Sequence, residues 1–210
     1  MKPARKATSK TSVALGFRVH SGWAAVVAVA GLLRSPEVVD RRRIEIADPA
    51  IPGSKQPLHA AEGLPLKNAE ALIGRCAAST RILARRAVRT LVLDLEKRGC
   101  AVIGAGILLA SGKPVPALAA TLASHALIHT AEGVFFRNAL IEASEHYNIP
   151  LVRVKERELF QCAASRLRLP AGELQRRVAE MGKLIGPPWR QDEKLAALVA
   201  WLVMAGASRQ

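Results

Sequence analysis

The run 100–110 (CAVIGAGILLA) constrains the fold most, because it is apolar almost throughout. A strand of this composition is typical of the interior of a sheet, where both faces are covered. A long helical segment at 66–98 precedes it, and Gly99 ends that helix as a C-terminal cap does. The pattern therefore predicts an α/β protein in which 100–110 is a central strand.

The N-terminal third predicts an antiparallel meander. Residues 13–31 (VALGFRVHSGWAAVVAVAG) fit two strands around a tight polar turn at 20–22. Residues 37–46 alternate as a third strand, with Arg41 and Arg43 on the same face. Short links between the three segments favour sequential pairing.

Helical and strand segments alternate after the meander. A loop rich in Pro and Gly at 48–65 precedes the helix at 66–98, and a helical region after 110 ends near His146. The remaining segments are a short strand at 151–154 and helices at 156–168, 171–184 and 191–205. The order β-β-β-α-β-α-β-α predicts a ribonuclease-H-like mixed sheet of the α/β class, with extra C-terminal helices.

A local resemblance strengthens this fold prediction. The run 131–161 (AEGVFFRNALIEASEHYNIPLVRVKERELFQ) combines a small-charged-Gly step at 131–133, a turn at 148–150, a strand and the segment KEREL. This run resembles the corresponding part of the RuvC-like crossover (Holliday) junction resolvases. The resemblance is clear over 97–206 and weaker over the meander.

The resolvase resemblance implies DNA repair or recombination, a homodimer and Mg²⁺ held by clustered carboxylates. The family pattern places an Asp on the first strand, a Glu on the fourth and two acids at the start of the last helix. Here 13–19 and 101–110 contain no acid, and Asp192 and Glu193 are adjacent. We therefore expect no efficient two-metal cleavage, and no cofactor, with Mg²⁺ only if an acidic site at Asp192 is functional. Alternatively, both acids only stabilise the start of a helix.

A second candidate for catalysis is the group His125, His129 and Glu132. In a helix these side chains fall in one narrow sector, where two imidazoles and a carboxylate could bind a transition metal or act as acid and base. By analogy with the fold, His20 could converge with them. We assign them as catalytic candidates and assign no metal ligand.

The alternative is that these histidines lie partly on different elements. Ser124 or Thr130 could cap a helix and leave Glu132 in its first turn. The spacing by itself does not separate the two arrangements, because histidine pairs four residues apart are common by chance.

The charge of the chain favours polyanions. Its net charge is +14, from 31 Lys and Arg against 17 Asp and Glu. DNA or another structured nucleic acid is the expected partner, and the candidate phosphate contacts are Arg41, Arg43, Arg81, Arg85, Arg86 and Arg89. Arg81, Arg85 and Arg89 form a stripe at helical spacing, although a solvated helix face would have the same pattern. Aromatic residues make up only 4% of the chain, so base stacking should contribute little.

Domain organisation and location follow from composition. Residues 1–12 are expected to be a disordered basic arm, and 13–210 a single domain. The arm has no apolar segment of a secretory signal, and no apolar run is long enough to span a bilayer. Three widely spaced cysteines fit a reduced cytoplasm.

Three functions remain open on the sequence. The first is a resolvase-like nucleic-acid-binding protein with degenerate or absent nuclease activity. The second is an enzyme of another class that uses the His/Glu site on the same fold. The third is a non-catalytic protein-interaction domain. Convergence of His20, His125, His129 and Glu132 in one cleft would favour the second.

Overall fold

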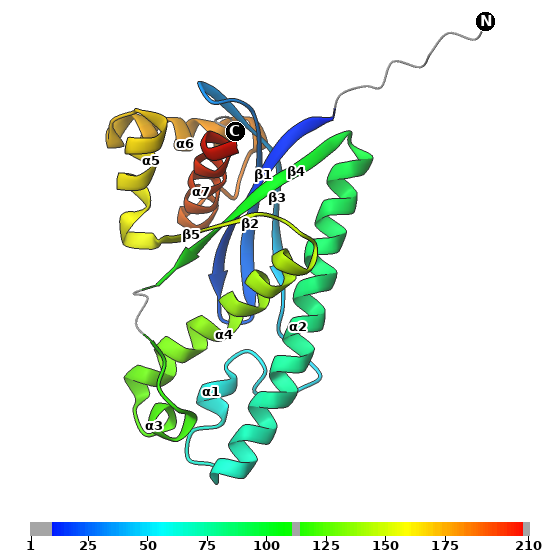
Figure 1. Ribbon diagram of the computed structural model, residues 1–210, viewed down its shortest axis with the longest axis vertical. Helices are drawn as coiled ribbons and strands as arrows, with labels where there is room; N and C mark the ends of the chain where they lie inside the picture. The colour runs from blue at the N-terminus through cyan, green and yellow to red at the C-terminus, as the bar shows by residue number, and fades with distance from the viewer. Residues whose placement is uncertain (1–9, 111–113, 208–210) are drawn as a thin grey trace, which may run out of the picture.

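A computed structural model describes residues 10–110 and 114–207 and shows a five-stranded mixed sheet with helices on both faces (Figure 1). The strand order is β3-β2-β1-β4-β5. The strands are β1 (Thr11–His20), β2 (Trp23–Leu32), β3 (Ser35–Glu45), β4 (Cys100–Leu109) and β5 (Leu151–Lys155).

The meander and the two later strands pair as predicted. β1, β2 and β3 are antiparallel neighbours, whereas β4 is parallel to both β1 and β5. The interior position of β4 is confirmed, but the middle strand of the sheet is β1. The apolar runs of β1 and β2 are as deeply buried as that of β4, so two-sided burial could not distinguish the middle strand.

The helices are α1 (Pro57–Ala60), α2 (Leu66–Lys97), α3 (Leu118–Leu122), α4 (His125–His146), α5 (Leu159–Leu167), α6 (Ala171–Ile185) and α7 (Gln191–Ala207), with a 3₁₀ turn, η1 (Glu156–Glu158), before α5. The order β-β-β-α-β-α-β-α is confirmed, and α1 and α3 are additions to it. α1 lies within the segment predicted as a loop at 48–65. α2 continues through Gly74 without a break.

Two apolar cores fill the space between the sheet and its helices. One face packs against α2 and α4 through residues such as Phe17, Leu91 and Phe136. The other face packs against α5, α6 and α7 through residues such as Val27 and Trp201. This division places α7 between the sheet and the outer helices (Figure 1).

α7 packs unusually close to the sheet. All its residues from Leu195 to Ala205 are buried, as expected for a helix that is apolar all round. A Cβ added at Gly16 of β1 would overlap the carbonyl oxygen of Ala196, and one at Gly106 of β4 would lie 2.6 Å from Cγ2 of Val199. The two glycines therefore fix the position of α7, including its N-terminus.

A smaller group of elements extends beyond the sheet, at the bottom of Figure 1. We call α1, α3 and the N-terminal parts of α2 and α4 the distal lobe. Its buried apolar cluster comprises only Leu58, Ile128 and Ala131, with a few half-buried neighbours. This lobe therefore has much less apolar packing than the sheet layers.

The predicted basic arm at 1–12 lies mostly outside the described residues. Its last two residues, Thr11 and Ser12, belong to β1, so that boundary was wrong. Their backbones pair with Cys100 and Ala101 of β4, which extends the strand beyond its apolar part. No helix of the described residues has the length and apolarity to cross a membrane.

Candidate functional sites

The carboxyl ends of the parallel strands carry the first polar cluster. β1 ends at His20, β4 ends at Leu109, and β5 leads into η1, so these ends meet near the N-terminus of α7. Sheets of parallel strands commonly bind ligands at this position. We call the residues gathered here the strand-end cluster: Arg18, His20, Arg137, Glu156 and Asp192.

Both carboxylates of the strand-end cluster have partners within it. The guanidinium of Arg18 lies 3.0 Å from Oε2 of Glu156, and its Nε lies 3.9 Å from Oδ1 of Asp192. His20 Nε2 lies 2.9 Å from the same Asp192 oxygen. The arrangement joins β1, η1 and α7 through one half-buried arginine.

Arg137 of α4 adds a second cation. Its Nε donates to the carbonyl oxygen of Leu108 in β4 at 3.0 Å. Burial, followed by the positive charge of Arg18, lowers the pKa of Arg137, and Glu156 partly opposes this shift. Two guanidinium groups therefore face two carboxylates at the strand ends.

The strand-end cluster does not fit the Mg²⁺ ions that the resolvase resemblance implies. Mg²⁺ binds through oxygen ligands, and a two-metal site needs several carboxylates to balance four positive charges. β1 and β4 supply none, and Arg18 and Arg137 occupy this region with positive charge. We therefore derive no catalytic step through Mg²⁺.

His20 does not join the other histidines, contrary to the predicted convergence. It hydrogen-bonds Asp192 and stacks on Trp23, with ring centroids 4.2 Å apart. The segment after β4 runs through α3 in the distal lobe before α4 begins (Figure 1). That detour places His125 and His129 away from the strand ends.

Asp192 and Glu193 both lie in the first turn of α7. Asp192 joins the strand-end cluster, and Glu193 accepts a hydrogen bond from the backbone N–H of Arg190 at 2.7 Å. Their negative charges also suit the N-terminal end of the helix dipole. These contacts support the alternative that both acids stabilise the start of the last helix.

The second polar cluster is in the distal lobe. His125 and His129 are one turn apart on α4, and their Nε2 atoms are 3.1 Å apart. His59 of α1 joins them, with its ring centroid 5.4 Å from that of His125 and 4.6 Å from that of His129. We call these three residues the histidine cluster.

Glu132 holds His59 rather than the two predicted histidines. Its Oε2 accepts from Nδ1 of His59 at 2.8 Å and from the backbone N–H groups of Leu58 and His59. Burial raises the pKa of Glu132, although the hydrogen bonds with His59 oppose the shift. The carboxylate therefore fixes α1 and its imidazole against α4.

The helical arrangement of His125, His129 and Glu132 is confirmed. α4 begins at His125, so Glu132 lies two turns into the helix and Thr130 does not cap it. Ser124 occupies the N-cap position but makes no side-chain cap bond. His59 was missed because it stands alone in a Pro- and Gly-rich segment, where no spacing pattern connects it to α4.

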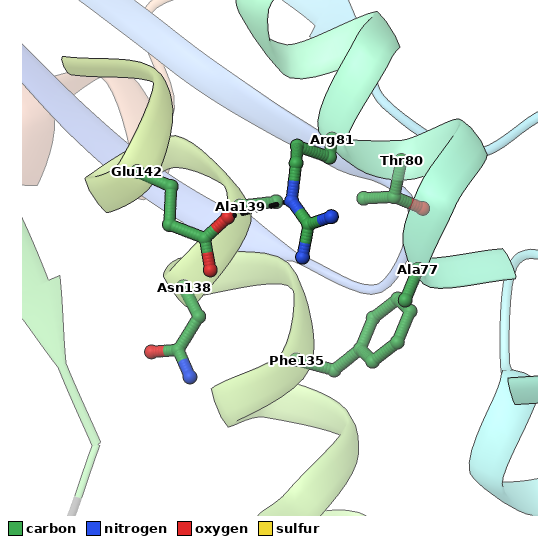
Figure 2. A pocket seen from close by; sticks show the side chains of 7 residues that line it. All are labelled: Ala77, Thr80, Arg81, Phe135, Asn138, Ala139 and Glu142. Carbon is green, nitrogen blue, oxygen red and sulfur yellow. Dashed lines mark hydrogen bonds and ion pairs between the residues drawn. The ribbon is translucent and has the colours of Figure 1, made fainter. Parts of the chain in front are cut away.

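The arginine stripe of α2 is only partly free. Nε of Arg81 donates to Oε2 of Glu142 on α4 at 2.8 Å, across the pocket in Figure 2. Arg85 is half-buried, and its Nε has no hydrogen-bond partner among the described residues. Arg86 and Arg89 are exposed and can reach a ligand in solution.

Arg41 and Arg43 of β3, the two predicted phosphate contacts on this strand, contact the protein itself. Arg41 donates to the carbonyl oxygens of Gly186, Pro187 and Pro188, and so connects β3 to the segment before α7. Arg43 pairs with Glu45 at 2.5 Å and lies 3.8 Å over the ring of Trp23. Arg43 is nevertheless exposed, whereas Arg41 is half-buried.

Comparison with known proteins is informative at the level of structure. No family model matches the chain, and no curated protein matches it. The structure of Thermus thermophilus RuvC in complex with a Holliday junction substrate matches with a TM-score of 0.53 and 10% identity, covering 94% of this chain and 96% of that chain. The chain has a RuvC-like fold. A second Thermus thermophilus RuvC structure matches with a TM-score of 0.51 and 12% identity over the same shares.

Proposed function

We propose that the chain is a resolvase-like nucleic-acid-binding protein that does not cleave phosphodiesters by a two-metal mechanism. Its RuvC-like fold and net charge of +14 support binding to a structured nucleic acid. Under this proposal the protein works in the cytoplasm, as expected from its three widely spaced cysteines, and as a homodimer, as the resolvase resemblance implies. Light scattering of the purified protein would measure its mass in solution and so test whether it is a homodimer.

The observation that carries the proposal is the presence of Arg18 and Arg137 at the strand ends. Their charges balance those of Glu156 and Asp192, so the cluster has little net negative charge with which to attract Mg²⁺. The same guanidinium groups suit phosphate oxygens. A nucleic-acid backbone could therefore approach this edge without a metal ion.

Binding and cleavage assays test the two parts of the proposal separately. Branched, duplex and single-stranded DNA and structured RNA would be titrated over a salt series, and cleavage would be followed with Mg²⁺ and with Mn²⁺. We expect binding whose logarithmic affinity falls linearly with the logarithm of salt concentration, and no turnover. Cleavage of junction DNA that Asp192→Ala abolishes would refute the loss of nuclease activity. No binding at low salt would support the interaction-domain alternative.

A triple variant assigns the binding surface to the stripe on α2. Replacing Arg81, Arg85 and Arg89 by Gln should flatten the salt dependence by about two units, or up to about three if Arg81 leaves Glu142 to contact a phosphate. The matched control replaces Arg168, Arg176 and Lys183 by Gln; these exposed residues lie at the end of α5 and on α6, across the sheet from α2. An unchanged slope in the folded α2 variant would remove the stripe from the interface.

The geometry weakens the second candidate, an acid-base enzyme built on His125, His129 and Glu132. Glu132 is buried, and its carboxylate accepts hydrogen bonds from the backbone N–H groups of Leu58 and His59 and from the His59 ring. It therefore faces away from solvent. His20, the fourth member of the expected cleft, is at the strand ends instead. The histidines of the distal lobe need another explanation.

A further inference from the structure

We propose that the histidine cluster is a binding site for a transition-metal ion of the Zn²⁺ class, with His59, His125 and His129 as ligands. The proposal is independent of nucleic-acid binding. It departs from the expectation that the chain holds no metal, because that expectation considered His125, His129 and Glu132 but not His59.

The positions of the donor atoms support a shared ion. One nitrogen from each histidine can be chosen so that all three lie within 4.8 Å of one another. Around a tetrahedral Zn²⁺, with Zn–N bonds of about 2.0 Å, the nitrogens would be separated by about 3.3 Å. Nε2 of His125 and Nε2 of His129 are already 3.1 Å apart, and both side chains are exposed. A small contraction therefore completes a three-nitrogen site.

The tautomer of His59 also suits a ligand. Its Nδ1 hydrogen-bonds the Glu132 carboxylate at 2.8 Å, which leaves Nε2 with a lone pair. That Nε2 is buried and has no hydrogen-bond partner among the described residues. Metal-bound histidines commonly donate their other ring N–H to a carboxylate in this way, which fixes the ring and raises its basicity.

The charge of Glu132 is a separate reason for a cation at this site. Only 3% of its side chain is exposed, and Oε1 has no hydrogen-bond partner among the described residues. His59 is its only ion-pair partner among those residues, and no Lys or Arg reaches it. A buried carboxylate is costly unless a positive charge compensates it. An ion on Nε2 of His59 would supply that charge through the imidazole.

The ligand set identifies the class of metal. Three imidazole nitrogens with no thiolate suit Zn²⁺, Co²⁺, Ni²⁺ or Cu²⁺, whereas Mg²⁺ and Ca²⁺ select oxygen ligands. The exposure of His125 and His129 leaves room for water as a fourth ligand. Glu62, with Oε1 3.6 Å from Nδ1 of His125, can accept a hydrogen bond from that ligand's outer nitrogen.

The site would connect α1 to α4 where apolar packing is weakest. Besides these polar contacts, α1 and α4 share the small cluster of Leu58, Ile128 and Ala131, against which a few half-buried side chains such as Phe135 pack. An ion bound to His59 and to the α4 pair would close the segment around α1 against the helix. Because metal binding stabilises only the state that holds the ligands together, it should stabilise the distal lobe.

Metal titration of the tag-free, full-length protein tests the proposal. After chelator treatment and dialysis, Co²⁺ and Zn²⁺ would be added separately, with binding measured by calorimetry and by Co²⁺ absorption. We expect one ion per chain and an absorption band of tetrahedral Co²⁺ that Zn²⁺ abolishes. Mg²⁺ should not compete. Absence of saturable binding by the folded wild-type protein would overturn the proposal.

Single substitutions assign the ligands. His125→Ala and His129→Ala remove exposed side chains, so they should fold normally and lower Zn²⁺ affinity at least tenfold, as should His59→Ala. The matched control is His146→Ala, an exposed histidine at the other end of α4, which should bind as tightly as the wild type. Glu132→Gln should weaken binding by about 10- to 100-fold. Equal affinity in the wild type and the folded His125→Ala and His129→Ala variants would refute the site.

Discussion

The strand-end cluster and the histidine cluster differ in how completely their polar groups are satisfied. At the strand ends, Arg18 and His20 contact both carboxylates. Nε of Arg18 is buried without a hydrogen-bond partner among the described residues, but it lies 3.9 Å from Oδ1 of Asp192, so its charge is paired. In the distal lobe, Nε2 of His59 and Oε1 of Glu132 are buried without hydrogen-bond partners among the described residues. Buried polar groups are costly when unpaired, so the second cluster is the one that favours an additional ligand.

The two clusters also differ in the charge that they offer. Guanidinium groups at the strand ends repel cations and attract phosphate, whereas imidazoles beside a buried carboxylate attract a metal ion. A RuvC-like fold can therefore carry positive charge at the edge where resolvases are expected to hold Mg²⁺. The site suited to a metal lies instead on elements added beyond the sheet.

The prediction with the largest expected effect tests how closely α7 packs against the sheet. Gly16→Ala places a methyl group against the Ala196 backbone, which cannot move without displacing α7, so we expect a loss of stability of about 3 kcal/mol or more. The control is Gly74→Ala in α2, where a Cβ meets nothing within 4 Å and should stabilise the helix by about 0.5–1 kcal/mol. Urea unfolding of both variants measures the contrast. Similar stability in both would show that α7 packs loosely.

The second prediction replaces a positive charge of the strand-end cluster by a negative one. Arg18→Asp would place three carboxylates together, so we expect a loss of about 2 kcal/mol after allowing for partial exposure. Millimolar Mg²⁺ should then raise the melting temperature of the variant but not that of the wild type. Arg157→Asp, at a residue whose side chain is 70% exposed, serves as the control and should change little. A wild type that Mg²⁺ stabilises equally would contradict the assignment of this cluster.

A third, local effect tests the distal lobe. Zn²⁺ should slow amide hydrogen exchange in α1 and the first turns of α4 by about tenfold or more, because opening of this lobe would require loss of the ion. Adding Zn²⁺ should leave the rate of amide hydrogen exchange in α7 unchanged. His129→Ala should remove the slowing, and uniform protection throughout the chain would argue for nonspecific binding.

The smallest effect concerns Asp40 of β3. Like the carboxylates of the strand-end cluster, its side chain is paired with guanidinium groups. Burial favours its protonation, but hydrogen bonds from Arg42 and Arg98 outweigh this and lower its pKa below the usual value of 3.8. A lowered pKa contributes stability above pH 3.8, which is lost as the pH falls through the folded-state pKa. Asp40→Asn should therefore lose less stability than the wild type on acidification below about pH 4. Parallel acid-unfolding curves would show that the pair adds nothing.

The sequence by itself determined most of the order of secondary structure. The alternation in 37–46, the apolar run 100–110 and the helix ended by Gly99 each reflect local periodicity or backbone preference, and each element formed as predicted. The spacing of His125, His129 and Glu132 was compatible with one helix, but it left open a break between them, which the structure excludes. The sequence also showed that the strands corresponding to β1 and β4 carry no acid. These features depend on residues close together in the chain.

Only the tertiary structure decided which distant residues meet. The middle place of β1 depends on pairing between strands far apart, and the contact of His20 with Asp192 depends on the close packing of α7 on Gly16. The path through α3 carries α4 away from the strand ends and brings His125 to His59. No regular spacing in the sequence connects such residues. Their contacts follow from how the helices and the sheet bury their apolar faces together.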